Sequence, residues 1–596
     1  MLLSGLSLGA MVFGAIYYVR GLQSQALTVH IQTQAQLQAW TGVEALRQYL
    51  GQQGALEAAK LSLDQQVNFG NLSGVSATVS AVAANDTMNC PSGGPTTRVG
   101  FNVTGSSGGG NSLLAAHFCV LGASSGSGAV GAPAAITIKG DLDLGGQLDV
   151  LGDTSSKMVV DGNVNGSGSL NGINNLYATG NISLGGATNL DVLFSEGNIA
   201  LSGSGLFSSV QAMKAVALSG TVGVSSLIAN GAITLGSNTV DSLTSFAGLT
   251  MRAASIGGMS VKGNVMSTNG AVNGLAVVVG SYRETSNGRV ASGFYSGTLT
   301  KPGSNNQIRM SKVSFLSMST AKLTASTVAT PQFDAYAYRS IANYAFTRIG
   351  NDTQVTVRSV SGIADGSYYL TGNGPNQDWL CSSNTYSPSN CVAKICKGWS
   401  EYNSCFSYGG GKWTVAGTTM APGTLWFNGD VSAASGTYYN NWLVTGNIDT
   451  AGSNLTQAVN YAGYANVCTN SDFPSLVPTN FCATGSNALT PLSHGNIAFG
   501  AGAAVGGVYS GGKISLAASN EVYGSVLAGD ILLTTGNTLV HGYVSAARQG
   551  SNVGNSSLGS STKIDLRDLP AGFDPGNTAP QTTWPMSAKL LWVRHR

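Results

Sequence analysis

Carboxylates are the side chains in this sequence that could catalyse a reaction or bind a metal. Four of them lie close together: Asp141, Asp143, Asp149 and Asp153. Asp141 and Asp143 are two residues apart, so on a strand their side chains share one face. Paired carboxylates can bind Ca²⁺, and paired carboxylates also cleave glycosidic bonds. Because the surrounding sequence is almost bare of charge, we favour the simpler interpretation of a solvated strand edge.

Other catalytic signatures are missing from the sequence. The histidines lack the paired spacing of metal ligands, and there is no phosphate loop and no Gly-x-Ser-x-Gly elbow with triad partners. The net charge of +2 gives no reason to expect nucleic-acid binding. We therefore predict no enzymatic activity and no cofactor, Ca²⁺ at the aspartates being the one exception considered. The histidines are His30, His117, His494, His541 and His595.

The eight cysteines indicate disulfides and hence an oxidising compartment. Proximity in sequence predicts Cys90–Cys119, Cys468–Cys482 and two bridges among the four cysteines between them. A four-cysteine zinc site is the alternative for these four, but no Cys-x-x-Cys motif and no nearby histidine supports it. The four are Cys381, Cys391, Cys396 and Cys405.

Aromatic residues are concentrated around the same four cysteines. One interpretation is an adhesive surface for a glycan or a surface receptor, because aromatic rings supply rigid contact area. The other is a disulfide-stapled insertion that uses these rings as its own core. The candidate adhesive residues are Trp379, Trp399, Tyr402, Tyr408 and Trp413.

A repeat of about 17 residues must position these side chains. A corner residue is followed by an alternating apolar strand, as in Gly180-Asn181-Ile182-Ser183-Leu184, and successive corners are mostly 17 residues apart. One such rung cannot bury its apolar face alone, so rungs must stack. We predict a parallel β-helix over 132–281. The corners are Gly162, Gly180, Gly197, Lys214, Gly231, Gly248 and Gly263.

The composition and a second set of corners agree with this fold. The chain has 82 glycines among 596 residues and only 9% charged residues, which fits an extracellular solenoid. The 17-residue spacing returns at Gly429 and Gly446, so we predict that one β-helix continues over 421–559 after an insertion at 282–420. A second independent solenoid is the alternative.

The N-terminal residues predict one long helix. No charged residue precedes Arg20, which is about enough to cross a bilayer. A stripe that includes Leu22, Leu37, Trp40 and Leu46 then continues to about Lys60 at helical spacing. A secretory signal peptide and a plain membrane anchor are the alternatives. The residues expected to face membrane or filament core are Leu2, Leu3, Leu6, Leu8, Val12, Phe13, Ile16 and Val19.

The remaining segments complete the expected organisation. After the helix of 1–65, alternating apolar residues predict a small antiparallel β head over 66–125. The C-terminal segment 560–596 loses the repeat and is expected to be a tail or solenoid cap. Its last apolar run, 589–594, could form a final strand.

The segment from Ala35 to Arg47, AQLQAWTGVEALR, resembles the stem of PilX-type minor pilins of type IV pili. A weaker resemblance to large PilX-like pilus assembly proteins covers parts of 334–370. The resemblance implies a helix that packs with other pilin subunits and a small head. Major pilins carry an assembly glutamate near the N-terminus, where this sequence has Gly5 and no acid before Glu44. That difference implies a minor or tip subunit.

Together these features predict a structural or adhesive subunit of a type IV pilus or related extracellular filament, with its β-helix projecting for adhesion or assembly. Its expected location is the inner membrane before assembly, then the filament at the cell surface. A membrane-anchored surface adhesin unrelated to pili is the alternative, and a polysaccharide-active β-helix enzyme is a third interpretation.

Overall fold

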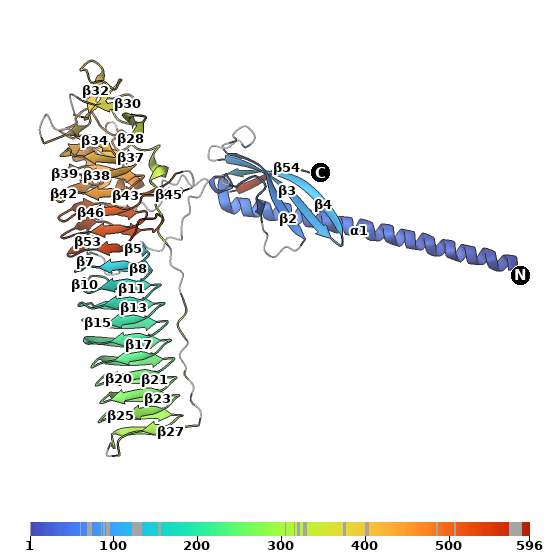
Figure 1. The fold of residues 1–596 in the computed structure, drawn as a ribbon, viewed down its shortest axis with the longest axis horizontal. Coiled ribbons are helices and arrows are strands. Elements are labelled where there is room, and N and C mark those ends of the chain that lie inside the picture. The colour runs from blue at the N-terminus through green and yellow to red at the C-terminus, as the bar shows by residue number, and fades with distance from the viewer. Residues whose placement is uncertain are drawn as a thin grey trace. The chain divides into compact units, whose positions relative to one another are not determined.

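The computed structural model divides the chain into two compact units, residues 1–127 with 581–596 and residues 128–580 (Figure 1). Side chains are described throughout the residues given below except at 2–10, 48, 51–54, 56–57, 84, 121 and 587. The structure describes residues 2–59, 61–67, 74–84, 86, 90, 96–121, 134–152, 156–303, 305–314, 316, 318, 322–325, 330–372, 377–399, 405–483, 485, 487–505, 508–570 and 587–595.

The first unit is a long helix, α1 (Leu2–Ala58), packed on a five-stranded antiparallel sheet. No proline precedes Pro91, so nothing of that kind interrupts the helix. The last strand of this sheet comes from the C-terminus of the chain, so the run 589–594 completes the head and does not cap the solenoid. The sheet order is β1 (Gln66–Val67), β2 (Val75–Ala84), β3 (Thr96–Ser107), β4 (Gly110–Leu121) and β54 (Ser587–His595).

Small residues set the face of α1 that meets the sheet. Ala35 and Ala39 are buried there with Leu46, and a Cβ on Gly105 of β3 would lie 2.2 Å from the Ala35 carbonyl oxygen. Alanine and glycine thus let helix and sheet approach closely. The stripe of apolar residues that was expected to face the head is partly wrong, because Leu37 is 63% exposed and Trp40 is 45% exposed.

The second unit is a parallel β-solenoid with three faces, as the 17-residue repeat predicts. The first face stacks β27 (Ile308–Lys312), β25 (Arg289–Tyr295), β23 (Ala271–Val278), β21 (Ser255–Val261), β19 (Thr239–Ser245), β17 (Thr221–Ala229), β15 (Ser204–Ala212), β13 (Leu190–Ser195), β11 (Asn175–Ala178), β8 (Lys157–Asp161), β5 (Ile136–Lys139), β51 (Val544–Ala546), β48 (Ser525–Ala528), β43 (Ile497–Ala501), β40 (Asn440–Val444), β37 (Gly423–Phe427) and β28 (Tyr344–Ile349).

The other two faces follow the same spatial order. The second face stacks β26 (Leu299–Thr300), β24 (Tyr282–Glu284), β22 (Val265–Thr268), β20 (Leu249–Arg252), β18 (Ile233–Leu235), β16 (Val216–Leu218), β14 (Ile199–Leu201), β12 (Ile182–Leu184), β9 (Val164–Gly166), β6 (Leu142–Leu144), β52 (Ser556–Leu558), β49 (Leu532–Thr534), β46 (Ile514–Leu516), β41 (Ile448–Thr450), β38 (Asp430–Ala433) and β35 (Lys412–Val415). The third face stacks β10 (Leu170–Asn171), β7 (Leu148–Leu151), β53 (Thr562–Asp565), β50 (Leu539–His541), β47 (Glu521–Tyr523), β42 (Asn454–Gln457) and β39 (Gly436–Tyr438).

Each rung buries its apolar residues against the next rung. On the second face Ile182 pairs with Ile199 and Ile199 with Val216, while the small residues between the apolar ones point outward. At the corners, asparagines continue the ladder: the Asn181 amide N donates to Asn163 Oδ1, and the Asn198 amide N to Asn181 Oδ1, both at 2.8 Å. Equivalent residues of successive rungs are thus hydrogen-bonded to each other, which explains why the same residue type recurs at each of these corners.

The order of the rungs differs from the order of the chain. β5, the first solenoid strand, pairs with β8 on one side and with β51 on the other. The later half of the solenoid therefore stacks on the beginning of the first half and does not follow its end. There is one solenoid, as expected, but the chain enters and leaves it in the middle.

A return segment connects the two halves. Its described residues 322–325 lie beside the rungs of the first half (Figure 1), where the side-chain amide of Asn230 donates to the Leu323 carbonyl (2.8 Å) and accepts from the Leu323 amide N (2.9 Å). The rungs before this segment extend to Lys312, so the expected insertion at 282 begins about 30 residues too early. The 17-residue spacing continues there at Gly280 and Gly297, but the strand after Gly280 carries Arg283 and Glu284 in place of the small and apolar residues of earlier rungs.

A cap of antiparallel strands, residues 344–420, closes the end of the solenoid opposite β27 (Figure 1). A short 3₁₀ helix, η1 (Ala335–Tyr338), precedes it in the chain. Besides β28, the cap contains β29 (Asp352–Val357), β30 (Gly366–Thr371), β31 (Trp379–Cys381), β32 (Cys391–Lys394), β33 (Cys396–Lys397), β34 (Phe406–Gly409), β35 and β36 (Thr419–Met420). In the later half of the solenoid, α2 (Val459–Cys468) and η2 (Ser493–Asn496) are inserted in the chain between one rung and the next. In the same half, β44 (Ala503–Val505) pairs with β45 (Val508–Ser510).

His494 in η2 makes stability depend on pH. Its ring packs edge-on against Phe481, with centroids 5.3 Å apart, and burial lowers its pKa to about 4. The unfolded chain therefore binds a proton more readily as the pH falls from the ordinary value of ~6.5. Across that window this residue removes up to roughly 3 kcal/mol of stability.

We predict that His494→Gln flattens the loss of stability between about pH 6.5 and about pH 4. The measurement is the urea midpoint of the wild type and the variant across this range. His30→Gln, on an exposed part of α1, is the matched control and should follow the wild-type curve. Equal pH slopes for wild type and His494→Gln would contradict the assignment.

Candidate functional site

The expected aspartate cluster belongs to ladders of hydrogen bonds between rungs. Asp141 Oδ1 accepts from the amide N and Nδ2 of Asn163, both at 2.9 Å. Asp143 accepts from Asn165 and Asn555, and Asp149 from Gln147 and Asn171. Asp153 lies outside the described residues. These carboxylates occupy positions that asparagine fills in other rungs, which agrees with a strand-edge role.

No metal site is formed among the residues that the structure describes. No group of three or more histidine, cysteine, aspartate or glutamate side chains is arranged to hold an ion there. His117 lies in the head sheet stacked on Trp592, with ring centroids 4.2 Å apart, while His494 lies in η2 and His541 in β50. The four cysteines considered for zinc are bonded in pairs.

The first half of α1 is an uncovered apolar surface. Every residue from 11 to 30 is exposed, and the exposed side chains include Phe13 (70%), Ile16 (47%) and Val19 (50%). Val12, another expected residue, is 51% exposed, whereas the side chains of Leu2, Leu3, Leu6 and Leu8 are not described. The expected membrane span is not confirmed: in the described part of the chain no helix is both long and apolar enough to cross a bilayer.

The four disulfides join cysteines that are near in sequence. Cys90–Cys119 staples the head, and Cys468–Cys482 staples the segment around α2, as predicted. Within the cap the structure resolves the open pairing as Cys381–Cys391 and Cys396–Cys405. All eight cysteines are therefore paired.

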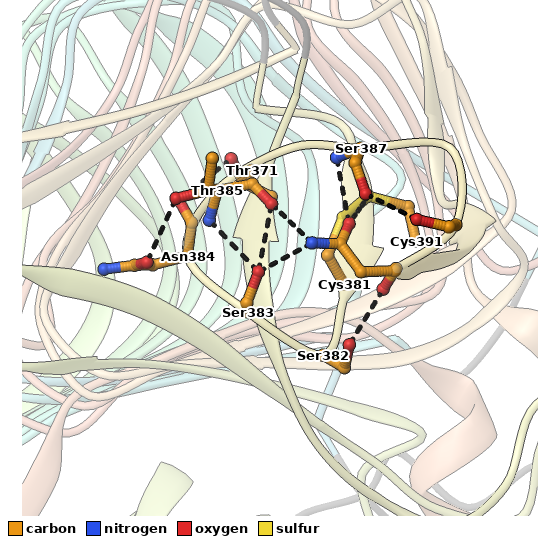
Figure 2. Close-up of a disulfide and its surroundings, with 10 residues drawn as sticks. Thr371, Cys381, Ser382, Ser383, Asn384, Thr385, Ser387 and Cys391 are labelled. Atoms are coloured by element: carbon orange, nitrogen blue, oxygen red, sulfur yellow. Dashed lines mark hydrogen bonds between the residues drawn. A yellow bond between two sulfur atoms is a disulfide. The ribbon is translucent and has the colours of Figure 1, made fainter.

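Figure 2 shows the cap loop, residues 382–390, which the Cys381–Cys391 disulfide closes. Asn390 organises it: Nδ2 donates to Ser383 Oγ (2.7 Å) and to the Thr385 carbonyl (2.8 Å), while Oδ1 accepts from the Ser387 amide N (2.9 Å). The loop is thus held by one covalent bond and a set of hydrogen bonds made by its own polar side chains.

The predicted adhesive aromatics separate into core and surface residues. Trp413 is fully buried against Phe346 and Phe427, so its assignment to a binding surface is wrong. It lies in an aromatic stack that fills the upper rungs, and its Nε1 donates to the Asn428 carbonyl (2.9 Å). Tyr408 is half-buried beside it.

Only part of the predicted set can reach a partner. Trp399 is 73% exposed, and Trp379 is half-buried with its ring edge-on to Tyr386 of the cap loop. Tyr402 lies outside the described residues. The cap therefore presents Trp399, Val392 (53% exposed) and the cap loop to solvent.

The sequence did not predict a charged network on the third face. Tyr523 stacks on His541 with ring centroids 4.0 Å apart, and its hydroxyl donates to Glu521 Oε1 (2.6 Å). This hydrogen bond raises the pKa of Tyr523 to about 12. On the rung after that of His541, the side chain of Arg567 donates two hydrogen bonds to Asp565. These bonds lower the pKa of the Asp565 carboxyl.

His541 lies between the two acids, 3.8 Å from Glu521 and 3.8 Å from Asp565, and burial lowers its pKa. The members of this network are about 20 residues apart in sequence, near the length of a rung. Spacing by one rung was therefore the only signal that could have grouped them.

Comparisons with known proteins give little. No protein-family model matches the sequence, and no curated protein matches it. Among solved structures, the chain is similar to the competence-associated pilin ComZ from Thermus thermophilus, with 12% identity over 95% of this chain and 97% of that chain. The TM-score is 0.25, and a likeness at this level carries no information on function.

We predict that replacing both Cys381 and Cys391 by serine loosens the cap loop without unfolding the solenoid. A disulfide closing a short loop contributes about 2–3 kcal/mol, and the aromatic core around Trp413 does not depend on it. Hydrogen exchange of residues 382–390 should become faster while the rungs stay protected. The matched control, serine at both Cys468 and Cys482, should leave hydrogen exchange in the cap loop unchanged. Faster exchange of the cap loop in this control would contradict a local role for the Cys381–Cys391 disulfide.

Proposed function

We propose that this chain is a subunit of a type IV pilus or a related extracellular filament, assembled through the first half of α1. The observation that carries the proposal is the exposed stretch from residue 11 to 30. As far as Val19 this stretch contains no charged residue and apolar residues occur on all its sides, and such a helix is normally buried. The described residues of the head cover only the second half of α1, and we propose that neighbouring subunits cover the first half.

Several features support an extracellular location and a structural role. Four disulfides require an oxidising compartment. The head is a compact helix-on-sheet unit, and the solenoid is a separate unit with its own continuous core. The low fraction of charged residues and the stacked rungs suit a domain that presents a surface to a partner more than they suit an enzyme active site. The resemblance of the stem to PilX-type minor pilins points the same way.

The cap is the part of the solenoid that we propose for adhesion. It exposes Trp399 and Val392 and also carries the hydrogen-bonded polar cap loop, a combination of apolar and hydrogen-bonding groups that suits contact with another surface. A membrane-anchored adhesin unrelated to pili would use the cap in the same way. The two functions differ in what covers the first half of α1.

We predict that Ile16→Asp abolishes incorporation into filaments while leaving the head folded. Ile16 is exposed on the first half of α1, away from the buried residues that hold the helix on the head, whereas an unpaired carboxylate buried between subunits costs several kcal/mol. The measurement is the amount of protein in sheared filaments relative to the cell-associated fraction.

Asn111→Asp, at an exposed position of β4 in the head and outside α1, adds an equal charge and serves as the control. Wild-type protein that stays entirely with the cells after shearing would favour the anchored adhesin. Normal incorporation of Ile16→Asp would contradict packing through this part of α1.

A further inference from the structure

A polar groove of about 470 Å³ runs along the third face of the solenoid. It crosses four neighbouring strands, in which Glu521 pairs with Leu539, Leu539 with Lys563, and Lys563 with Asp149. The first three strands belong to the later half of the solenoid and the fourth, β7, to the first half. The groove is therefore complete only where the end of the solenoid chain stacks on its beginning.

The walls of this groove offer both donors and acceptors of hydrogen bonds. The Lys563 ammonium, the Asn537 amide and the Glu521 Oε2 atom make no hydrogen bond or ion pair with other residues that the structure describes. Glu521 is held in place by the Tyr523 hydroxyl at its other oxygen. Asp149 is likewise held by Gln147 and Asn171, each donating at 2.9 Å or less. The two carboxylates are thus held in place before any ligand arrives.

The charges in the groove select against anionic ligands. Glu521, Lys563 and Asp149 together carry a net charge of −1, so phosphates and acidic polymers would meet more repulsion than attraction. A peptide strand would find no free backbone edge, because every groove strand is paired on both sides. An uncharged ligand rich in hydroxyl groups fits best, since carboxylates accept from hydroxyls and ammonium and amide groups donate to them.

The spacing of the rungs favours a linear chain of sugars. Neighbouring parallel strands are ~4.8 Å apart, close to the length of one pyranose unit in an extended chain. Each rung can therefore contact a successive unit over about 14 Å. Leu539, half-buried in the second rung, provides an apolar contact for the C–H face of a ring.

We propose that this groove binds a linear, neutral oligosaccharide lying along the solenoid axis. Lys563 and Asn537 donate to its hydroxyl oxygens, and Glu521, oriented by Tyr523, accepts from its hydroxyl groups. This inference goes beyond the proposed filament role, because the groove lies on the solenoid and assembly depends on α1.

The test measures calorimetric binding of three linear neutral probes, cellohexaose, maltohexaose and mannohexaose, to the full-length chain in a detergent without a sugar head group. At least one probe should bind in a saturable way. Glu521→Gln and Lys563→Met should each weaken that binding by about tenfold, equivalent to ~1.4 kcal/mol. Lys262→Met, an exposed lysine on a solenoid corner outside the groove, is the matched control and should leave binding unchanged.

Three results would overturn the proposal. One is the absence of saturable binding for all three probes. Another is binding that neither groove substitution changes although both variants retain the wild-type melting temperature, which would place the ligand elsewhere. The third is tighter binding of an acidic hexagalacturonate chain than of any neutral probe, which would contradict selection by charge. Because Ile16→Asp leaves the groove intact, failure of this proposal and failure of the filament proposal are distinguishable.

Discussion

A solenoid rung of about 17 residues cannot bury its own apolar face, and this constraint governs the rest of the structure. Inward residues such as Ile182 and Ile199 are buried only because another rung lies on either side. Corner asparagines bond to corner asparagines for the same reason. The ends then require special treatment. One end is closed by the antiparallel cap, and the last rung at the other end carries Lys301, Pro302 and Lys312, residue types that discourage pairing by a stray strand.

The sequence predicts the features that repeat along the chain and the contacts between residues that are close in sequence. The rung length, the two-residue alternation and the long helix all arise from short-range patterns, and nearest-neighbour pairing places Cys90 with Cys119 and Cys468 with Cys482. The order of the rungs could not be predicted in this way. Gly429 and Gly446 have the same spacing as Gly180 and Gly197, and an identical repeat does not reveal which rung lies next to which. The placement of β54 in the head is a long-range pairing of the same kind.

The candidate sites show the same division. Asp141 and Asp143 are close in sequence and suggested chemistry, but each continues a hydrogen-bond ladder. Trp413 lies near four cysteines and suggested a binding surface, yet its ring is buried in the core against Phe346 and Phe427. The groove on the third face escaped prediction because Asp149 and Lys563 are more than 400 residues apart in the chain and adjacent in space. Only the stacking of the last strands on the first brings them together.

The entry and exit of the chain at neighbouring rungs determine how the solenoid carries mechanical load. The chain enters at β5 and leaves after β53, which pairs with β7 of the same first rung. A pull between the head and the cap would be transmitted through the rungs from β5 to β28. The rungs from β8 to β27 would bear none of this force. Tension would therefore strain only the half of the solenoid that ends in the disulfide-bonded cap, and the other half would keep its shape under force.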